Sequence, residues 1–75
     1  MQKLNELSAG SKCIVCVVNG TKDFQRRITA VGLTPGCKLE IVKNEGKYPL
    51  LIDARNTILA LNRTDCGEIM VEVAQ

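Results

Sequence analysis

Short apolar segments, separated by turn residues, constrain the fold of this chain more than any other feature. Five of them carry the alternation or β-branched composition of strands, at residues 11–18, 37–44, 50–54, 57–61 and 69–73. In 75 residues, so many short strands suggest a small closed or nearly closed β-barrel, in which closure would remove exposed sheet edges. We therefore predict a mainly β fold of about five strands and one short α-helix, in a single domain over residues 1–75.

Only "DFQRRITAVG" has a helical period. Phe24, Ile28 and Val31 recur at i, i+4 and i+7, which predicts a helix over about 23–31 with these three side chains facing the core. Asp23 is expected to be the N-cap, and Gly32 to adopt the left-handed conformation that ends a helix.

The loops and strand faces follow from the same pattern. Pro35-Gly36 is expected to turn the chain, and 45–49 to form a loop. Arg55-Asn56 separates two strands by only two residues, which predicts a tight hairpin. Residues 62–68 form either one helical turn or a bend. The alternation predicts two inward rows, Cys37, Leu39 and Ile41 in one strand and Ile69, Val71 and Val73 in another.

The segment "CIVC", Cys13 to Cys16, raises the question of a metal or redox site. On a strand, residues three apart face opposite ways with Cα atoms roughly 10 Å apart, too far for a disulfide or for shared ligation of one zinc ion. We therefore interpret both as small apolar strand residues. Convergence of all four cysteines into a thiolate site remains an alternative, without the second paired spacing that usually marks one.

Composition excludes several classes of function. The net charge is +2, and the chain has two aromatic residues and no histidine. These features favour neither a nucleic-acid partner nor membrane insertion. The first residues contain no apolar run typical of a signal peptide, so we expect a cytoplasmic protein with reduced thiols. No nucleophile lies beside a base, so we do not expect an enzyme.

The candidate site residues are individually weak signals. Arg26 and Arg27 are expected on the exposed side of the helix, where basic residues are usually solvated. Asp65 and Glu68 have oxygen ligands for a hard cation, although carboxylates in a turn are more often caps. Cys66 adds a thiol beside them.

The order of the motifs resembles the ferrous iron transport protein A family, FeoA, over nearly the whole chain. That family reads "L-x-x-L-x-x-G", then "R-R-L/I-x-x-x-G-L/I-x-P-G", then "h-A-L-x-x-x-x-A/S-x-x-I-x-V", where h is apolar. "RRITAVGLTPG" is the most specific match. The matching residues are Leu4, Leu7, Gly10, Arg26, Arg27, Ile28, Gly32, Leu33, Pro35, Gly36, Leu59, Ala60, Leu61, Ile69 and Val71. Arg55-Asn56 departs from the glycine common at the hairpin, and Cys66 from the usual alanine.

The resemblance implies an SH3-like barrel that acts as a cytosolic accessory of FeoB, a membrane ferrous iron transporter with a GTP-binding domain. It favours a binding module that docks on the cytosolic domain of FeoB and modulates uptake. We expect the docking surface to include Arg26, Arg27 and Pro35, with Tyr48 as an outlying candidate. The alternative is a metal-binding or metal-sensing domain for a transition metal ion, Fe²⁺ or Zn²⁺, with Asp65, Glu68 and Cys66 as candidate ligands.

Overall fold

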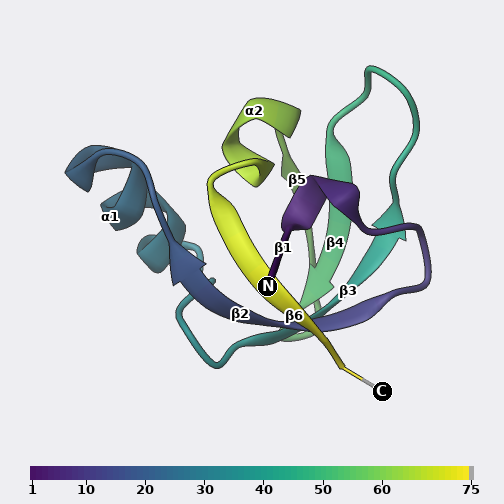
Figure 1. Ribbon diagram of the computed structural model, residues 1–75, viewed down its shortest axis with the longest axis horizontal. Coiled ribbons are helices and arrows are strands. Elements are labelled where there is room, and N and C mark those ends of the chain that lie inside the picture. Colours follow the sequence, from purple (N-terminus) through teal and green to yellow (C-terminus); the bar gives the residue numbers. More distant parts are fainter. Residues whose placement is uncertain (75) are drawn as a thin grey trace.

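One antiparallel sheet of six strands dominates the computed structural model, which describes residues 1–74 (Figure 1). The strand order is β1-β6-β2-β3-β4-β5. The elements in chain order are β1 (Gln2–Lys3), η1 (Leu4–Glu6), β2 (Lys12–Val18), α1 (Lys22–Ala30), β3 (Lys38–Lys43), β4 (Leu50–Ala54), β5 (Thr57–Leu61), α2 (Arg63–Cys66) and β6 (Ile69–Ala74).

The sequence prediction of about five strands missed β1. This strand is only two polar residues long, so it has no alternation to detect, and it is held by pairing of Gln2 and Lys3 with β6. The expected hairpin is present, with Arg55 and Asn56 both at positive φ (55° and 61°), which defines a type I′ turn. Residues 63–66 form the helical turn that was one of the two alternatives for this segment.

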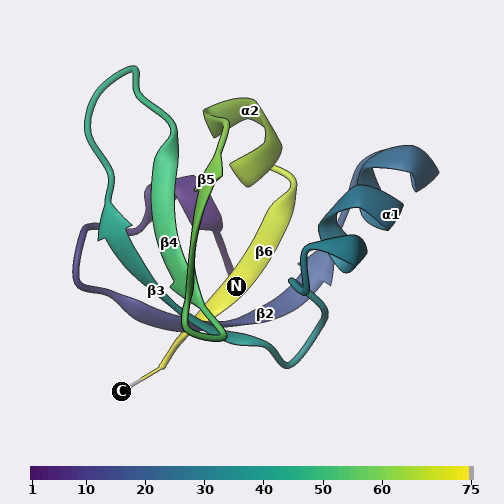
Figure 2. The same ribbon diagram turned by 180° about the vertical axis from the view of Figure 1, so that it is seen from behind.

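The sheet curls around the core without closing through strand pairing (Figures 1 and 2). Two register shifts, between Val15 and Val17 in β2 and between Ile41 and Lys43 in β3, mark bulges. Bulges bend a strand and increase its twist, which lets so short a sheet curve. Among the described strands, β5 pairs with β4 alone, so β1 and β5 are the edges.

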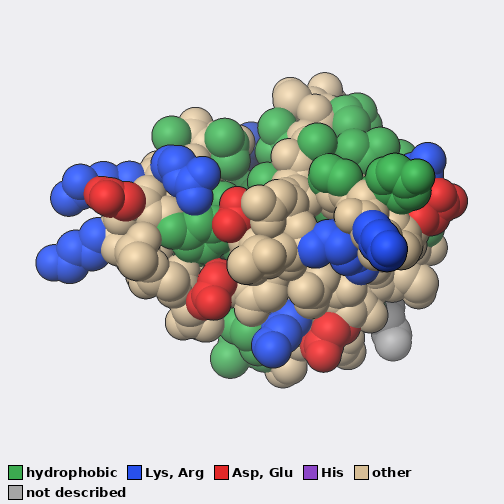
Figure 3. All heavy atoms as spheres, turned by 90° about the horizontal axis from the view of Figure 1, so that it is seen from above, with side chains coloured by type: hydrophobic (Ala, Val, Ile, Leu, Met, Phe, Trp, Pro, Cys, Tyr) green, Lys and Arg blue, Asp and Glu red, His purple; other side chains and the backbone are tan. Residues whose placement is uncertain are grey.

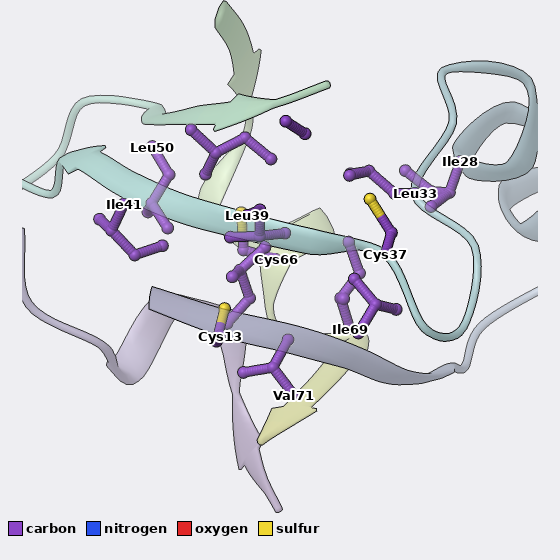
Figure 4. Packing of buried hydrophobic residues seen from close by; sticks show 14 of the residues in the cluster. Cys13, Ile28, Leu33, Cys37, Leu39, Ile41, Leu50, Cys66, Ile69 and Val71 are labelled. Atoms are coloured by element: carbon purple, nitrogen blue, oxygen red, sulfur yellow. The ribbon is translucent and has the colours of Figure 1, made fainter. Parts of the chain in front are cut away.

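The core is one cluster of apolar side chains from the sheet, from η1, α1 and α2, and from the loops after η1 and α1 (Figure 4). Both predicted inward rows contribute, except that Val73 is 46% exposed. Val73 lies opposite Cys13 in the ladder, but near the end of β6, beyond the residues paired with β1. No polar or charged side chain among residues 1–74 is buried.

Helix α1 begins one residue earlier than predicted, at Lys22. Thr21, not Asp23, is the N-cap, because its hydroxyl accepts a hydrogen bond from the backbone N–H of Phe24 (3.1 Å). Phe24 and Ile28 are buried as expected, whereas Val31 follows the last helical residue and is 48% exposed. The residues that α1 buries are therefore Phe24 and Ile28.

The end of α1 explains the Gly-Leu pair of the sequence motif. Leu33 N–H donates to Ile28 O (3.1 Å) and Gly32 N–H donates to Thr29 O (3.0 Å). These are the two bonds of a Schellman motif, and Gly32 has the required positive φ (95°). Leu33 then enters the core fully buried. No helix in the described part of the chain is long and apolar enough to cross a membrane.

Candidate functional site

The outer face of α1 is exposed and carries charged side chains. Lys22, Gln25, Arg26, Thr29 and Ala30 line a shallow, open hollow on this face. The helix stands to one side of the barrel in Figures 1 and 2, and Figure 3 shows Lys and Arg side chains projecting at that end of the molecule. These five residues are exposed, so this face of α1 takes no part in the core.

Arg26 and Arg27 lie on α1 as predicted, but in different environments. Arg26 is within 3.5 Å of Asp23, and the two side chains are 78% and 92% exposed. Ion pairs this exposed contribute little to stability, so Arg26 can exchange its partner at low cost. The Arg27 guanidinium lies 5.6 Å from the centre of the Phe24 ring, a cation–π contact that fixes its direction.

Pro35 is exposed at a turn that is tied to the sheet. Cys37 N–H donates to Thr34 O (2.9 Å), and Gly36 has a positive φ of 91°, as in a type II turn. Gly36 N–H also donates to Val15 O (2.7 Å). The loop that follows α1 is therefore anchored to β2, which limits how far the helix can move.

Tyr48 is not part of the α1 surface. Its side chain is 69% exposed in the loop between β3 and β4, which lies at the opposite end of the barrel from α1 (Figure 1). The outlying candidate therefore belongs to a second surface.

A hydrogen-bonded group that the sequence did not reveal holds this second end together. The Arg63 guanidinium donates to Asn44 Oδ1 (2.7 Å) and to Tyr48 O (3.1 Å). The Asn44 side-chain amide donates to Leu7 O (2.6 Å) and Asn5 O (3.2 Å), and the Asn5 amide donates to Arg63 O (3.2 Å). We call Asn5, Asn44 and Arg63 the polar clasp. Its members are far apart in sequence, and no spacing could have indicated it.

The metal-ligand candidates do not form a cluster. Asp65 N–H donates to Asn62 Oδ1 (3.1 Å) at the start of α2, and Glu68 is exposed. Cys66 is fully buried, and burial, reinforced by Asp65, raises the pKa of its thiol to about 11. Within residues 1–74, no three Asp, Glu, Cys or His side chains are grouped as metal ligands.

The cysteines of "CIVC" face opposite sides of β2, as predicted. Cys13 is buried, and burial raises the pKa of its thiol to about 11. Cys16 is half-buried, with its Sγ 3.6 Å from Ile14 O. All four thiols are free. Figure 4 shows Cys13, Cys37 and Cys66 among aliphatic side chains, where free cysteine acts as a small hydrophobic residue.

A curled antiparallel sheet with one projecting helix places the molecule among small SH3-like β domains. The model of the FeoA domain family matches residues 2–73, and the chain belongs to this family. FeoA proteins are small accessory proteins of ferrous iron transport. The resemblance drawn from "RRITAVGLTPG" and its flanking motifs is thus confirmed.

Solved FeoA structures share the whole fold. A crystal structure of an iron uptake regulatory protein (FeoA) has a TM-score of 0.91 at 25% identity, over 96% of both chains. The solution structure of FeoA from Chlorobium tepidum has a TM-score of 0.87 at 26% identity, over 99% of this chain and 71% of that one.

A more distant FeoA, from Stenotrophomonas maltophilia, is described as an SH3 domain protein and was crystallised with zinc. Its TM-score is 0.81 at 23% identity, over 96% of this chain and 91% of that one, so the likeness concerns the fold alone. No curated protein matched the sequence.

Proposed function

We propose that this protein is a cytoplasmic binding module of ferrous iron transport. It docks on the cytosolic domain of the transporter FeoB through the outer face of α1 and the turn at Pro35. Membership of the FeoA family supports the role in iron transport. We choose this surface because the outer face of α1 is basic and its side chains are not needed for packing of the core.

The geometry supports a docking role for Arg26 in particular. Its side chain is 78% exposed, and the ion pair that it forms within residues 1–74 is to a more exposed carboxylate of the same helix. A partner carboxylate that excludes water from this face would compete well with Asp23, because interactions between charges strengthen as the local dielectric falls. Charges at the rim of an interface mainly raise the association rate and set specificity, so binding should weaken as salt is added.

The test is a titration of the purified protein against the cytosolic domain of FeoB from the same organism. Arg26→Glu should weaken binding about tenfold or more, by about 1.4 kcal/mol, with most of the change in the association rate. Lys47→Glu makes the same charge change in the loop between β3 and β4 and is the matched control. If the two substitutions weaken binding equally, the assignment of the docking surface to α1 is refuted. Absence of binding, together with normal iron uptake after deletion of the gene, would refute the function itself.

Metal binding is the second candidate function, favoured by the zinc complex of the Stenotrophomonas maltophilia protein. In this chain it would use Asp65, Glu68 or Cys66 to hold Fe²⁺ or Zn²⁺. The buried thiol of Cys66, with its raised pKa, is a poor ligand because metal binding requires the thiolate. Calorimetric titration with Zn²⁺ tests this candidate. Zn²⁺ binding by the wild-type protein that is lost in the double variant Asp65→Asn/Glu68→Gln would establish the site. Titration heats no larger than the heat of dilution of Zn²⁺ would exclude it.

A further inference from the structure

Strand β5 is a sheet edge without the usual protection against pairing. It is the last strand of the sheet, and its ladder with β4 runs from Thr57 to Leu61 without a register shift. The strand has no charged residue and no proline. Natural proteins blunt exposed edges with charges, prolines, bulges or very short strands. The other edge, β1, is protected in this way, since it is two residues long and includes Lys3.

The hairpin geometry shows which backbone groups of β5 lack a partner in the sheet. In the type I′ turn at Arg55-Asn56, Ala54 and Thr57 form the closing hydrogen-bonded pair. Hydrogen-bonded pairs alternate along an antiparallel ladder, so Leu59 and Leu61, which lie opposite Ile52 and Leu50, bond to β4. The N–H and C=O groups of Ile58 and Ala60 therefore point away from β4, along the free edge.

The side chains at these two positions are apolar and exposed. Ile58 is 57% exposed on the outer face, opposite Asp53, and Ala60 is exposed opposite Leu51. Leu59 and Leu61 face the other way and pack against the core. An occupant of this edge must therefore be an extended strand that supplies two donors and two acceptors and covers an isoleucine without introducing charge.

We propose that the occupant is β5 of a second copy of this chain, paired antiparallel about a two-fold axis at Leu59. In this register Ile58 exchanges two backbone hydrogen bonds with Ala60 of the second copy, and Ala60 does the same with Ile58. All the outward-pointing groups of both residues are then satisfied. On the outer face, the largest exposed side chain of the strand lies beside the smallest, so the strand is complementary to itself.

Charge and area set the strength of this dimer. The strand is neutral and the net charge of each copy is only +2, so repulsion is small. A contact made through a strand of five residues is far smaller than the roughly 800 Å² per partner of a stable complex. The dimer is therefore weak and reversible, and it forms at high protein concentration.

Sedimentation velocity from about 10 µM to about 1 mM protein tests the proposal, because small interfaces of this kind dissociate on dilution. The wild-type protein should shift from monomer toward dimer over this range. Ile58→Lys should remain monomeric at all concentrations. Val73→Lys introduces the same charge at a similarly exposed valine of β6, away from the edge, and should dimerise like the wild type. Thermal unfolding of both variants checks that they are folded.

Amide hydrogen exchange in the wild-type protein identifies the surface independently of any variant. The Ile58 and Ala60 amides should exchange about tenfold more slowly at the highest concentration than at the lowest, because dimerisation protects them. The Thr57, Leu59 and Leu61 amides, already bonded to β4, should not change. A protein that stays monomeric at about 1 mM, or a dimer that leaves Ile58 and Ala60 unprotected, would overturn the proposal.

Discussion

Removal of the Asn44 side chain should destabilise the barrel more than its partial exposure suggests. Asn44→Ala deletes three hydrogen bonds at once, two to the carbonyls of Asn5 and Leu7 and one from the Arg63 guanidinium. These bonds connect the start of the chain, the loop after β3 and α2, which no strand ladder joins directly. Because the clasp joins three separate segments, we expect its loss to affect the whole fold.

The magnitude follows from the bonds. Each neutral hydrogen bond contributes about 1 kcal/mol net, and a bond from a charged donor about 1.5 kcal/mol or more. Partial exposure lets water replace some of them, so we expect a loss of about 2–3 kcal/mol. A domain of this size has roughly 4–11 kcal/mol of stability in total. With a urea dependence of about 1 kcal/mol per M, the unfolding midpoint should fall by about 2–3 M.

The matched control for Asn44→Ala is Asn19→Ala. Asn19 is an exposed loop residue that bonds through its backbone N–H to Glu68 O, a bond that alanine retains. Its substitution should change stability by less than about 0.5 kcal/mol. A double-mutant cycle of Asn44→Ala with Arg63→Met should give a coupling energy of about 1 kcal/mol. Equal midpoints for the Asn44 and Asn19 variants, or zero coupling to Arg63, would refute the clasp as a stabilising unit.

Three further predictions concern the thiols and a turn. The pKa values of Cys13 and Cys66 are raised from 9.0 to about 11 in the folded state. The contribution of each protonated thiol to stability is therefore fully present below about pH 9. As the pH rises to 11, the free energy of unfolding falls by about 2–3 kcal/mol for each thiol, because the unfolded chain ionises first. In urea titrations from pH 8 to 11, Cys66→Ala should reduce this decline by about half; an unchanged decline would contradict the assignment. At neutral pH, Cys66→Ser should lower stability by about 1–3 kcal/mol, because the buried site would hold a hydroxyl in place of a thiol. Gly36→Ala, at φ 91° with open space around the added methyl, should cost about 1–2 kcal/mol from backbone strain alone, measured by thermal unfolding; no loss would contradict the strained turn.

Residues with a local signal were the ones whose structure could be predicted from the sequence. The period of two over residues 37–41 correctly placed Cys37, Leu39 and Ile41 in the core, and Gly32 correctly marked the end of α1. Periodicity gives the direction of a side chain but not what covers it. For that reason Val31 and Val73, which fit their patterns, are exposed at the ends of their elements.

The features that sequence reasoning missed depend on contacts between distant segments. The polar clasp brings together residues 5, 44 and 63, and β1 exists only because β6 lies beside it. Within residues 1–74, β5 pairs with β4 alone. This too is a property of the whole sheet, because the sequence of β5 is that of an ordinary strand. The metal candidates Asp65, Glu68 and Cys66 are close in sequence, but α2 buries the thiol while Glu68 stays exposed.

The most specific motif of the chain, "RRITAVGLTPG", mainly serves to position α1. Gly32 and Leu33 complete the Schellman motif and anchor the helix in the core, and Gly36 ties the following turn to β2. Arg27 is partly structural as well, since it lies over the Phe24 ring. Arg26 alone among these has no contact that the fold needs. Most of the motif therefore builds the scaffold, whereas the docking that we propose would use Arg26 and the other exposed residues of the outer face of α1.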